Sequence, residues 1–165
     1  KHQTGDDDRW LFLPALDLVR RIAASDKRTS FAGSDFFYED VSGRSIDADE
    51  HELVGTTEHY YVLRNRPKDA GTVEFSYYDM HIHKGTFLPI QAEYFDRNGA
   101  KYRVYKTLAV DTIQGRPTVT RASMSDLKKG GTTTVSYRDV AYDVGLPEEI
   151  FTERFLRQAP AGLLR

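Results

Sequence analysis

The sequence predicts a mainly β protein, built as one curved antiparallel sheet or incomplete β-barrel with short covering helices. Three observations lead to this fold class. From about Glu52 onward the pattern is strand, turn, strand, with no βαβ alternation. Ten Tyr and nine Phe stand against two Met, a bias typical of strands. Stretches rich in helix formers are absent apart from the region Leu16 to Ala24.

Composition limits the class of partner. A chain of 165 residues fits one domain, so we expect residues 1–165 to form a single domain. The formal charge of −2 and the pI near 6.2 give no basic surface for nucleic acid. No apolar run approaches the roughly 20 residues of a membrane span, and no signal peptide is visible. Since the chain starts at Lys1, we expect it to be the C-terminal portion of a longer domain, with the N-terminal part of the fold absent.

The N-terminal region contains two expected strands. Residues 9–13 form a short apolar run, and Pro14 marks its end because proline donates no ladder hydrogen bond. The next run, Leu16 to Ile22, has two interpretations. Its alternation favours a strand, whereas the spacing of Leu16, Val19 and Ala23 also fits a helix. We favour the strand.

Residues 30–43, SFAGSDFFYEDVSG, concentrate four aromatic side chains, and we call them the aromatic segment. Ser34 or Asp35 can cap a helix and Gly43 can end one, which predicts one or two helical turns over 35–41. Consecutive helical residues point about 100° apart. The three aromatic residues at 36–38 therefore cannot all face one place. The segment either plugs the core or covers a cavity as a lid.

Six strands are expected after the aromatic segment. Asn98-Gly99 is a strong hairpin signal between two of them. Alternation places apolar side chains on one face of each strand and polar ones on the other, as an antiparallel meander requires. The expected strands are 52–64, 72–83, 88–96, 101–112, 116–126 and 132–142, followed by a short turn or strand at 147–156. The expected apolar faces carry Tyr78, Met80 and Ile82; Ile90, Ala92 and Tyr94; and Tyr102, Val104, Leu108 and Val110.

That sheet lacks obvious cover. An apolar sheet face must be buried against another layer. The visible cover is the aromatic segment and whatever precedes Lys1. A loosely fitting cover would leave a cavity.

The sequence contains no motif that indicates an enzyme or a metal-binding protein. His81 and His83 share one strand face with Asp79, but these three side chains span about 13 Å of strand and would need a further ligand such as His59. The alternative is a solvent-facing polar strand. The P-loop, Gly-x-Ser-x-Gly and His-Glu-x-x-His motifs are absent. We therefore expect no enzyme activity, no catalytic residue, no metal and no cofactor.

A small basic cluster lies beside the aromatic segment. It consists of Arg20-Arg21 and Lys27-Arg28. Such a cluster is either a solvated strand end or a contact for an acidic partner or lipid head group.

The stretch WLFLPALDLVRRIAASDKRTSFAGSDFFYEDV, residues 10–41, resembles the hallmark region of the LolA-like, outer-membrane lipoprotein-sorting protein family. Residues 10–16, 20–22 and 30–40 match, with Ala32 in place of the usual Met. Residues 87–106 and 148–156 resemble later strands and the closing Phe-Thr-x-Arg-x-Leu of the family. The chain departs from the family at 81–83, where His-Ile-His replaces a Trp-Val-Asp-like triplet.

The resemblance implies a LolA/LppX-like incomplete barrel around an apolar cavity. It also implies a Gram-negative periplasmic carrier that shields lipid or lipoprotein acyl chains without covalent chemistry. An inner-membrane transporter and an outer-membrane acceptor would be its partners. The alternative is an envelope protein-interaction or stress-sensor module using the same fold. The expected lining or lid residues are Trp10, Phe12, Leu18, Phe31, Phe36, Phe37, Tyr78, Met80, Ile82 and Met124.

Overall fold

The computed structural model describes residues 7–157, which pack as two compact units. The smaller unit contains residues 7–27 and 142–157, and the larger contains Arg28–Ala141. The expectation of a single domain stays a prediction.

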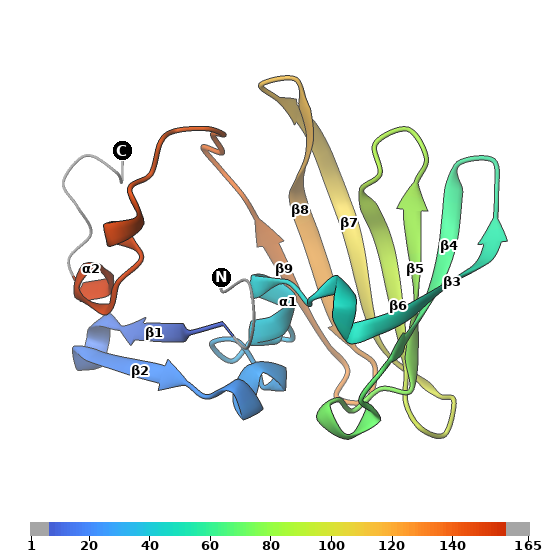
Figure 1. Cartoon of the computed structure of the whole chain (residues 1–165), viewed down its shortest axis with the longest axis horizontal. Coiled ribbons are helices and arrows are strands. Elements are labelled where there is room, and N and C mark those ends of the chain that lie inside the picture. The colour runs from blue at the N-terminus through green and yellow to red at the C-terminus, as the bar shows by residue number, and fades with distance from the viewer. Residues whose placement is uncertain (1–6, 158–165) are drawn as a thin grey trace. The chain divides into compact units, whose positions relative to one another are not determined.

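The larger unit is an antiparallel sheet of seven strands that does not close into a barrel (Figure 1). The strands follow one another in chain order, so each one pairs with its sequence neighbours and β3 and β9 form the two edges. This confirms the expected mainly β, curved antiparallel fold. The strands are β3 (Asp49–Thr56), β4 (Tyr60–Pro67), β5 (Tyr77–His83), β6 (Pro89–Phe95), β7 (Lys101–Ile113), β8 (Arg116–Asp126) and β9 (Gly131–Ser136).

Three expected strands have wrong boundaries. The region 52–64 is a hairpin, because Thr57 accepts a hydrogen bond from the Tyr60 N–H and reverses the chain. β3 also contains a bulge between Leu53 and Gly55. The region 72–83 becomes a strand only at Tyr77, after a 3₁₀ turn at 70–72. The last expected strand, 132–142, ends at Ser136.

The expected apolar faces are confirmed at Tyr78 of β5 and Ala92 of β6, which are buried. In β7, Tyr102 and Val104 are buried as expected, but the alternation predicted for this strand is wrong. In β7, Arg103 pairs with Tyr94 and Lys101 pairs with Phe95, so Tyr102 is an additional, bulged residue. A bulge shifts the alternation by one residue. Arg103 and Tyr105 therefore take the face assigned to Val104, and Leu108 and Val110 are 43% and 41% exposed.

Phe75 belongs to the core although it lies before β5 begins and does not follow the strand alternation. Its ring contacts Tyr78 at 5.5 Å and Tyr94 at 5.6 Å between centroids. Phe75 is 1% exposed and belongs to the core cluster of the larger unit.

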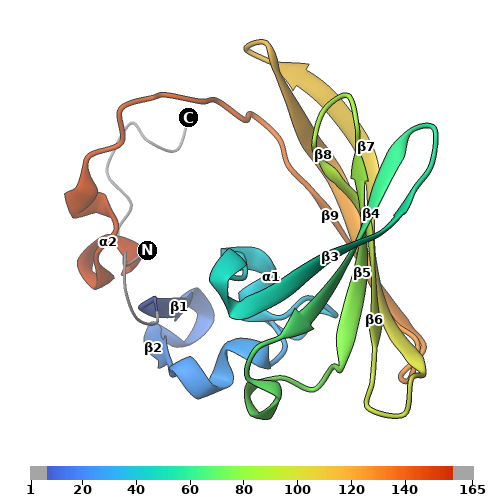
Figure 2. The same cartoon turned by 45° about the vertical axis from the view of Figure 1, so that its right-hand side comes forward.

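Helix α1 (Tyr38–Ser42) lies on one side of the sheet, as Figure 2 shows. Gly43 ends it at a positive φ of 82°, as expected. The expected start is wrong. Ser34 closes a turn by donating to the Phe31 carbonyl and accepting from the Phe36 N–H, while Asp40 accepts from the Phe37 N–H at 2.6 Å. The helix therefore begins three residues later than predicted.

The smaller unit contains a two-stranded hairpin and a short helix. Its strands are β1 (Arg9–Leu13) and β2 (Leu18–Ile22), joined by a 3₁₀ turn at Pro14–Leu16. The strand interpretation is therefore confirmed for Leu18 to Ile22. The C-terminal region forms a 3₁₀ turn at Glu148–Ile150 and helix α2 (Glu153–Arg157), so it is helical rather than extended.

Candidate functional site

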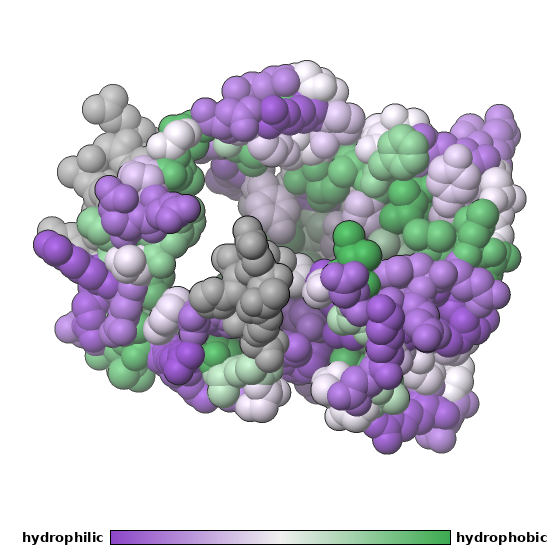
Figure 3. Space-filling model, in the orientation of Figure 1, coloured by the Kyte–Doolittle hydropathy of each residue, from purple (hydrophilic) through white to green (hydrophobic). Residues whose placement is uncertain are grey.

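A cavity of about 860 Å³ lies within the larger unit, between the sheet and the segment that contains α1. Figure 3 shows hydrophobic residues gathered over the strands of the sheet, beside more hydrophilic ones. The apolar and aromatic lining residues are Phe31, Ala32, Phe36, Val41, Ile46, Leu63, Tyr78, Met80, Pro89, Ala92, Tyr94, Tyr105, Met124, Val135 and Tyr137.

One row of cross-strand partners forms the sheet wall of this cavity. Ala92 is directly opposite Met80 on one side and Tyr105 on the other. Leu63 extends the row beyond Met80, and Met124 extends it beyond Tyr105. Directly opposite residues in a sheet share a face. The row is therefore apolar across five strands, and alanine at its centre leaves space above the sheet.

The opposite wall carries ion pairs. Glu39 of α1 contacts Arg28 at 2.9 Å and Arg44 at 3.2 Å. Arg44 also pairs with Asp49 at 2.7 Å, and Arg28 pairs with Glu74. Burial alone would raise the pKa of the Glu74 carboxyl, but its hydrogen bond from Arg28 and the Arg28 charge lower it. These pairs fasten α1 and the turns beside it to the sheet.

Arg103 is the most deeply buried cation of the described residues and joins the aromatic segment to β7. Its side chain is 1% exposed, and Nη2 donates to Asp40 at 2.6 Å and to the Asp35 carbonyl at 2.8 Å. Its guanidinium lies 3.7 Å from the centre of the Phe37 ring. Nε and Nη1 are buried without a hydrogen-bond partner in residues 7–157. The aromatic segment is therefore held by charge as well as by packing.

The pKa values of Tyr78 and Tyr94, which both line the cavity, are raised. Burial is the main cause for both hydroxyls, followed by the charge of Asp49 for Tyr78 and of Asp40 for Tyr94. The Tyr78 hydroxyl donates to Asp49 at 2.9 Å. The two rings stack with 5.0 Å between centroids. Both groups therefore remain protonated donors at neutral pH.

His51 lines the cavity and contacts two acceptors. Nδ1 lies 2.7 Å from Asn65 Oδ1, and Nε2 lies 2.9 Å from the Ile46 carbonyl. Asn65 Nδ2 donates to the Leu63 and Tyr78 carbonyls, which fixes the orientation of that amide. Both ring nitrogens must donate, so the geometry favours the imidazolium. The bonds to Asn65 and Ile46 accordingly raise the pKa of His51.

The structure brings five of the ten expected binding residues together in the cavity lining. Phe37 lies outside the lining and stacks on Arg103 instead. Ile82 is on β5 but outside the lining, and three residues belong to the smaller unit. Those in the lining are Phe31, Phe36, Tyr78, Met80 and Met124; those in the smaller unit are Trp10, Phe12 and Leu18. Their role in binding stays a prediction.

Sequence reasoning missed the charged half of the lining. Arg28 was assigned to a basic cluster, and no role was assigned to Arg44. One signal was available in Glu39-Asp40, two adjacent acids next to an aromatic run, which need cations if that run is buried. Arg103 gave no signal, because its inward orientation depends on the bulge at Tyr102.

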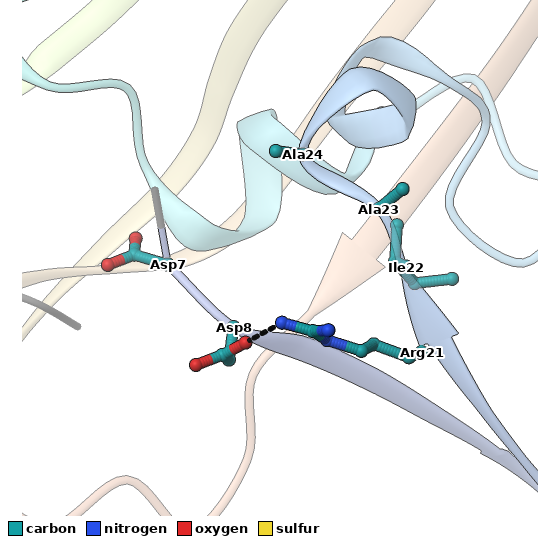
Figure 4. A pocket seen from close by; sticks show the side chains of 6 residues that line it. All are labelled: Asp7, Asp8, Arg21, Ile22, Ala23 and Ala24. Carbon is teal, nitrogen blue, oxygen red and sulfur yellow. Dashed lines mark hydrogen bonds and ion pairs between the residues drawn. The ribbon is translucent and has the colours of Figure 1, made fainter. Parts of the chain in front are cut away.

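A second, smaller pocket of about 290 Å³ lies within the smaller unit (Figure 4). Its lining residues come from the start of β1 and the end of β2. Arg21 Nη2 contacts Asp8 Oδ1 at 2.6 Å across it. Arg21 of the predicted basic cluster is thus paired with an acid.

The histidines of β5 make other contacts. Asp79 pairs with Arg64 at 2.7 Å, and His83 Nδ1 lies 3.0 Å from the Thr86 hydroxyl. The ring of Tyr60 contacts both His81 and His83. Within residues 7–157, no group of three His, Cys, Asp or Glu side chains is arranged to hold a metal ion.

A protein-family model described as "-like: Uncharacterized protein" matches residues 1–158. The chain belongs to this family. It is LolA-like in fold, as the solved structures similar to it show. No curated protein matches the sequence. Within the described part of the chain, no helix has the length and hydrophobicity needed to cross a membrane.

Three solved structures resemble this LolA-like chain. A DUF1329 family protein from Desulfovibrio piger is 30% identical, with a TM-score of 0.81 over 92% of this chain and 65% of that one. This chain thus spans somewhat less than two thirds of that relative. A protein from Vibrio parahaemolyticus, described as a putative outer membrane lipoprotein-sorting protein domain, is 27% identical and has a TM-score of 0.82. The match covers 94% of this chain and 68% of that one. LolA superfamily protein NE2245 from Nitrosomonas europaea is 24% identical and has a TM-score of 0.63. The match covers 90% of this chain and 67% of that one, and it supports the fold alone.

Proposed function

We propose that this chain acts as one LolA-like carrier domain in the periplasm, where it shields lipid or lipoprotein acyl chains from water. The observation that supports this most directly is the cavity of about 860 Å³ with its row of apolar side chains across five strands. That volume lies within the usual range of ligand pockets, about 300–1,000 Å³. The relatives' descriptions as lipoprotein-sorting and LolA superfamily proteins agree with this class.

Burial supplies the binding energy in this proposal, with no catalytic step. Each methylene transferred from water to the cavity contributes about 0.8 kcal/mol. Several acyl carbons can thus offset the cost of ordering the ligand without specific polar contacts. An inner-membrane donor and an outer-membrane acceptor would load and unload the domain.

Filling the cavity tests the proposal. Ala92 stands at the centre of the apolar row and is 2% exposed, so Ala92→Phe places a ring where a ligand would lie. We expect the wild type to take up the hydrophobic fluorophore N-phenyl-1-naphthylamine and to yield lipid on organic extraction. Ala92→Phe should lower the uptake at least tenfold.

The control is Ala100→Phe, which makes the same change in the exposed turn between β6 and β7. It should bind the fluorophore as the wild type does. Thermal unfolding of both variants separates loss of binding from loss of fold. Equal uptake by Ala92→Phe and the wild type would contradict the proposal.

The edge strand β3 supports a second candidate function, an envelope protein-interaction or sensor module. β3 pairs only with β4 among the described strands, and Leu53 and Val54 on it are 58% and 40% exposed. An exposed edge can accept an additional strand from a partner. Under this second function, Val54→Pro should remove the partner protein from a pull-down and leave fluorophore uptake intact. If Val54→Pro instead abolishes fluorophore uptake and retains the partner, the result favours the carrier function.

A further inference from the structure

The charges around the cavity are balanced. The cations are three guanidinium groups and the His51 imidazolium, and four carboxylates face them, so the formal charge is zero. Loss of the His51 proton would make the group negative. The guanidinium groups belong to Arg28, Arg44 and Arg103, and the carboxylates to Glu39, Asp40, Asp49 and Glu74.

Each of the three guanidinium groups already contacts a carboxylate at short range. Arg28 lies 2.9 Å from Glu39, Arg44 lies 2.7 Å from Asp49, and Arg103 lies 2.6 Å from Asp40. An anionic head group entering here would approach the Glu39 and Asp40 carboxylates of the lining, and the two guanidinium groups of the lining, Arg28 and Arg44, already contact Glu39. Like charges repel strongly where water is excluded. The site is therefore unsuited to an ionised phosphate or carboxylate.

The same region offers a hydrogen-bond donor. Tyr94 lines the cavity, and within residues 7–157 its hydroxyl makes no hydrogen bond. Its cross-strand partner is Arg103, whose guanidinium lies 5.5 Å from the Tyr94 ring centre. A hydroxyl without a protein partner gains a hydrogen bond when a ligand supplies an acceptor. A neutral oxygen acceptor would accept this hydrogen bond without adding charge.

On the basis of the proposed carrier function, we infer that the cavity selects neutral lipids that carry acceptor oxygens, such as acyl esters or amides, over lipids with ionised head groups. The Tyr94 hydroxyl binds the acceptor. The apolar row from Leu63 to Met124 contacts the acyl chain of the lipid.

Competition between two ligands of equal chain length tests the inference. The protein is loaded with N-phenyl-1-naphthylamine at pH 8 and then titrated with either monolaurin or laurate. Laurate is the ionised form of dodecanoic acid at this pH. We expect monolaurin to displace the fluorophore at a concentration at least tenfold lower than laurate. Equal or stronger displacement by laurate overturns the inference and leaves the carrier function standing. If the fluorophore does not bind, or neither ligand displaces it, both fall.

Two variants locate the effect. Asp40→Asn leaves Arg103 without a counter-charge, so laurate should bind about tenfold more tightly and the preference for monolaurin should shrink. Tyr94→Phe should weaken monolaurin about two- to tenfold, the range for one hydrogen bond. Tyr77→Phe is the matched control, since Tyr77 lies outside the cavity lining and its ring stacks on Phe95. Equal monolaurin affinities in the Tyr94 and Tyr77 variants would remove Tyr94 from the site.

Thermal unfolding shows whether Asp40→Asn has kept its fold. If it has not, Glu39→Gln makes the same test, because Glu39 balances Arg28 and Arg44. An unchanged laurate affinity in the folded variant overturns the electrostatic part of the inference.

Discussion

The two walls of the cavity are built from different interactions. The sheet wall is a ladder of strands with an apolar row on its face, and its shape depends on backbone hydrogen bonds and packing. The α1 wall has a helix of five residues, far too short to be stable alone, and ion pairs fasten it. Charge thus replaces length as the means of holding the cover in place.

The largest effect should come from breaking the Arg103–Asp40 pair. Arg103→Met leaves Asp40 buried without its cation, and removing one partner of a buried pair costs about 3–5 kcal/mol of unfolding free energy. Urea denaturation measures the loss. The double variant Arg103→Met, Asp40→Leu should recover most of it and retain a deficit of about 1 kcal/mol, because Asp40 also caps α1. A single-variant loss below 1 kcal/mol would contradict the role assigned to this pair.

A smaller effect is expected on the sheet wall. Met124 is 1% exposed and borders a space that already exists, so Met124→Ala should cost about 2 kcal/mol, the low end for a buried methionine. Fluorophore uptake should persist with altered emission, since the cavity only enlarges. Val104→Ala is the control, because Val104 is buried outside the lining. Abolished uptake in a folded Met124→Ala would show that this wall requires a close fit.

The smallest effect concerns His51 and depends on pH. Because the folded-state pKa of His51 is raised, its stabilising contribution is fully present below the unfolded value of about 6.5 and disappears as pH rises through the folded-state value. The stability difference between the wild type and His51→Phe should therefore be largest near pH 5–6 and smallest in mild alkali. If the stability difference between the wild type and His51→Phe grows with pH, the pKa of His51 is not raised by folding.

Sequence patterns predicted the sheet wall better than the α1 wall. The apolar positions of β5 and β6 follow from simple alternation, and Tyr78 and Met80 were expected near the cavity for that reason. The orientation of β7 could not be predicted, because the bulge at Tyr102 depends on pairing with a strand distant in sequence. The ion pairs around α1 were also inaccessible, since Arg28, Glu39 and Glu74 meet only after folding.

The bulge in β3 has a consequence for solubility. An open sheet has an unpaired edge strand, which can pair with the edge strand of an identical chain and lead to fibres. In β3 the irregularity after Leu53 disrupts the flat template such stacking needs, and Glu50 and Glu52 would bring like charges close together in a second copy. A sheet that does not close into a barrel is thereby protected against polymerising along this edge.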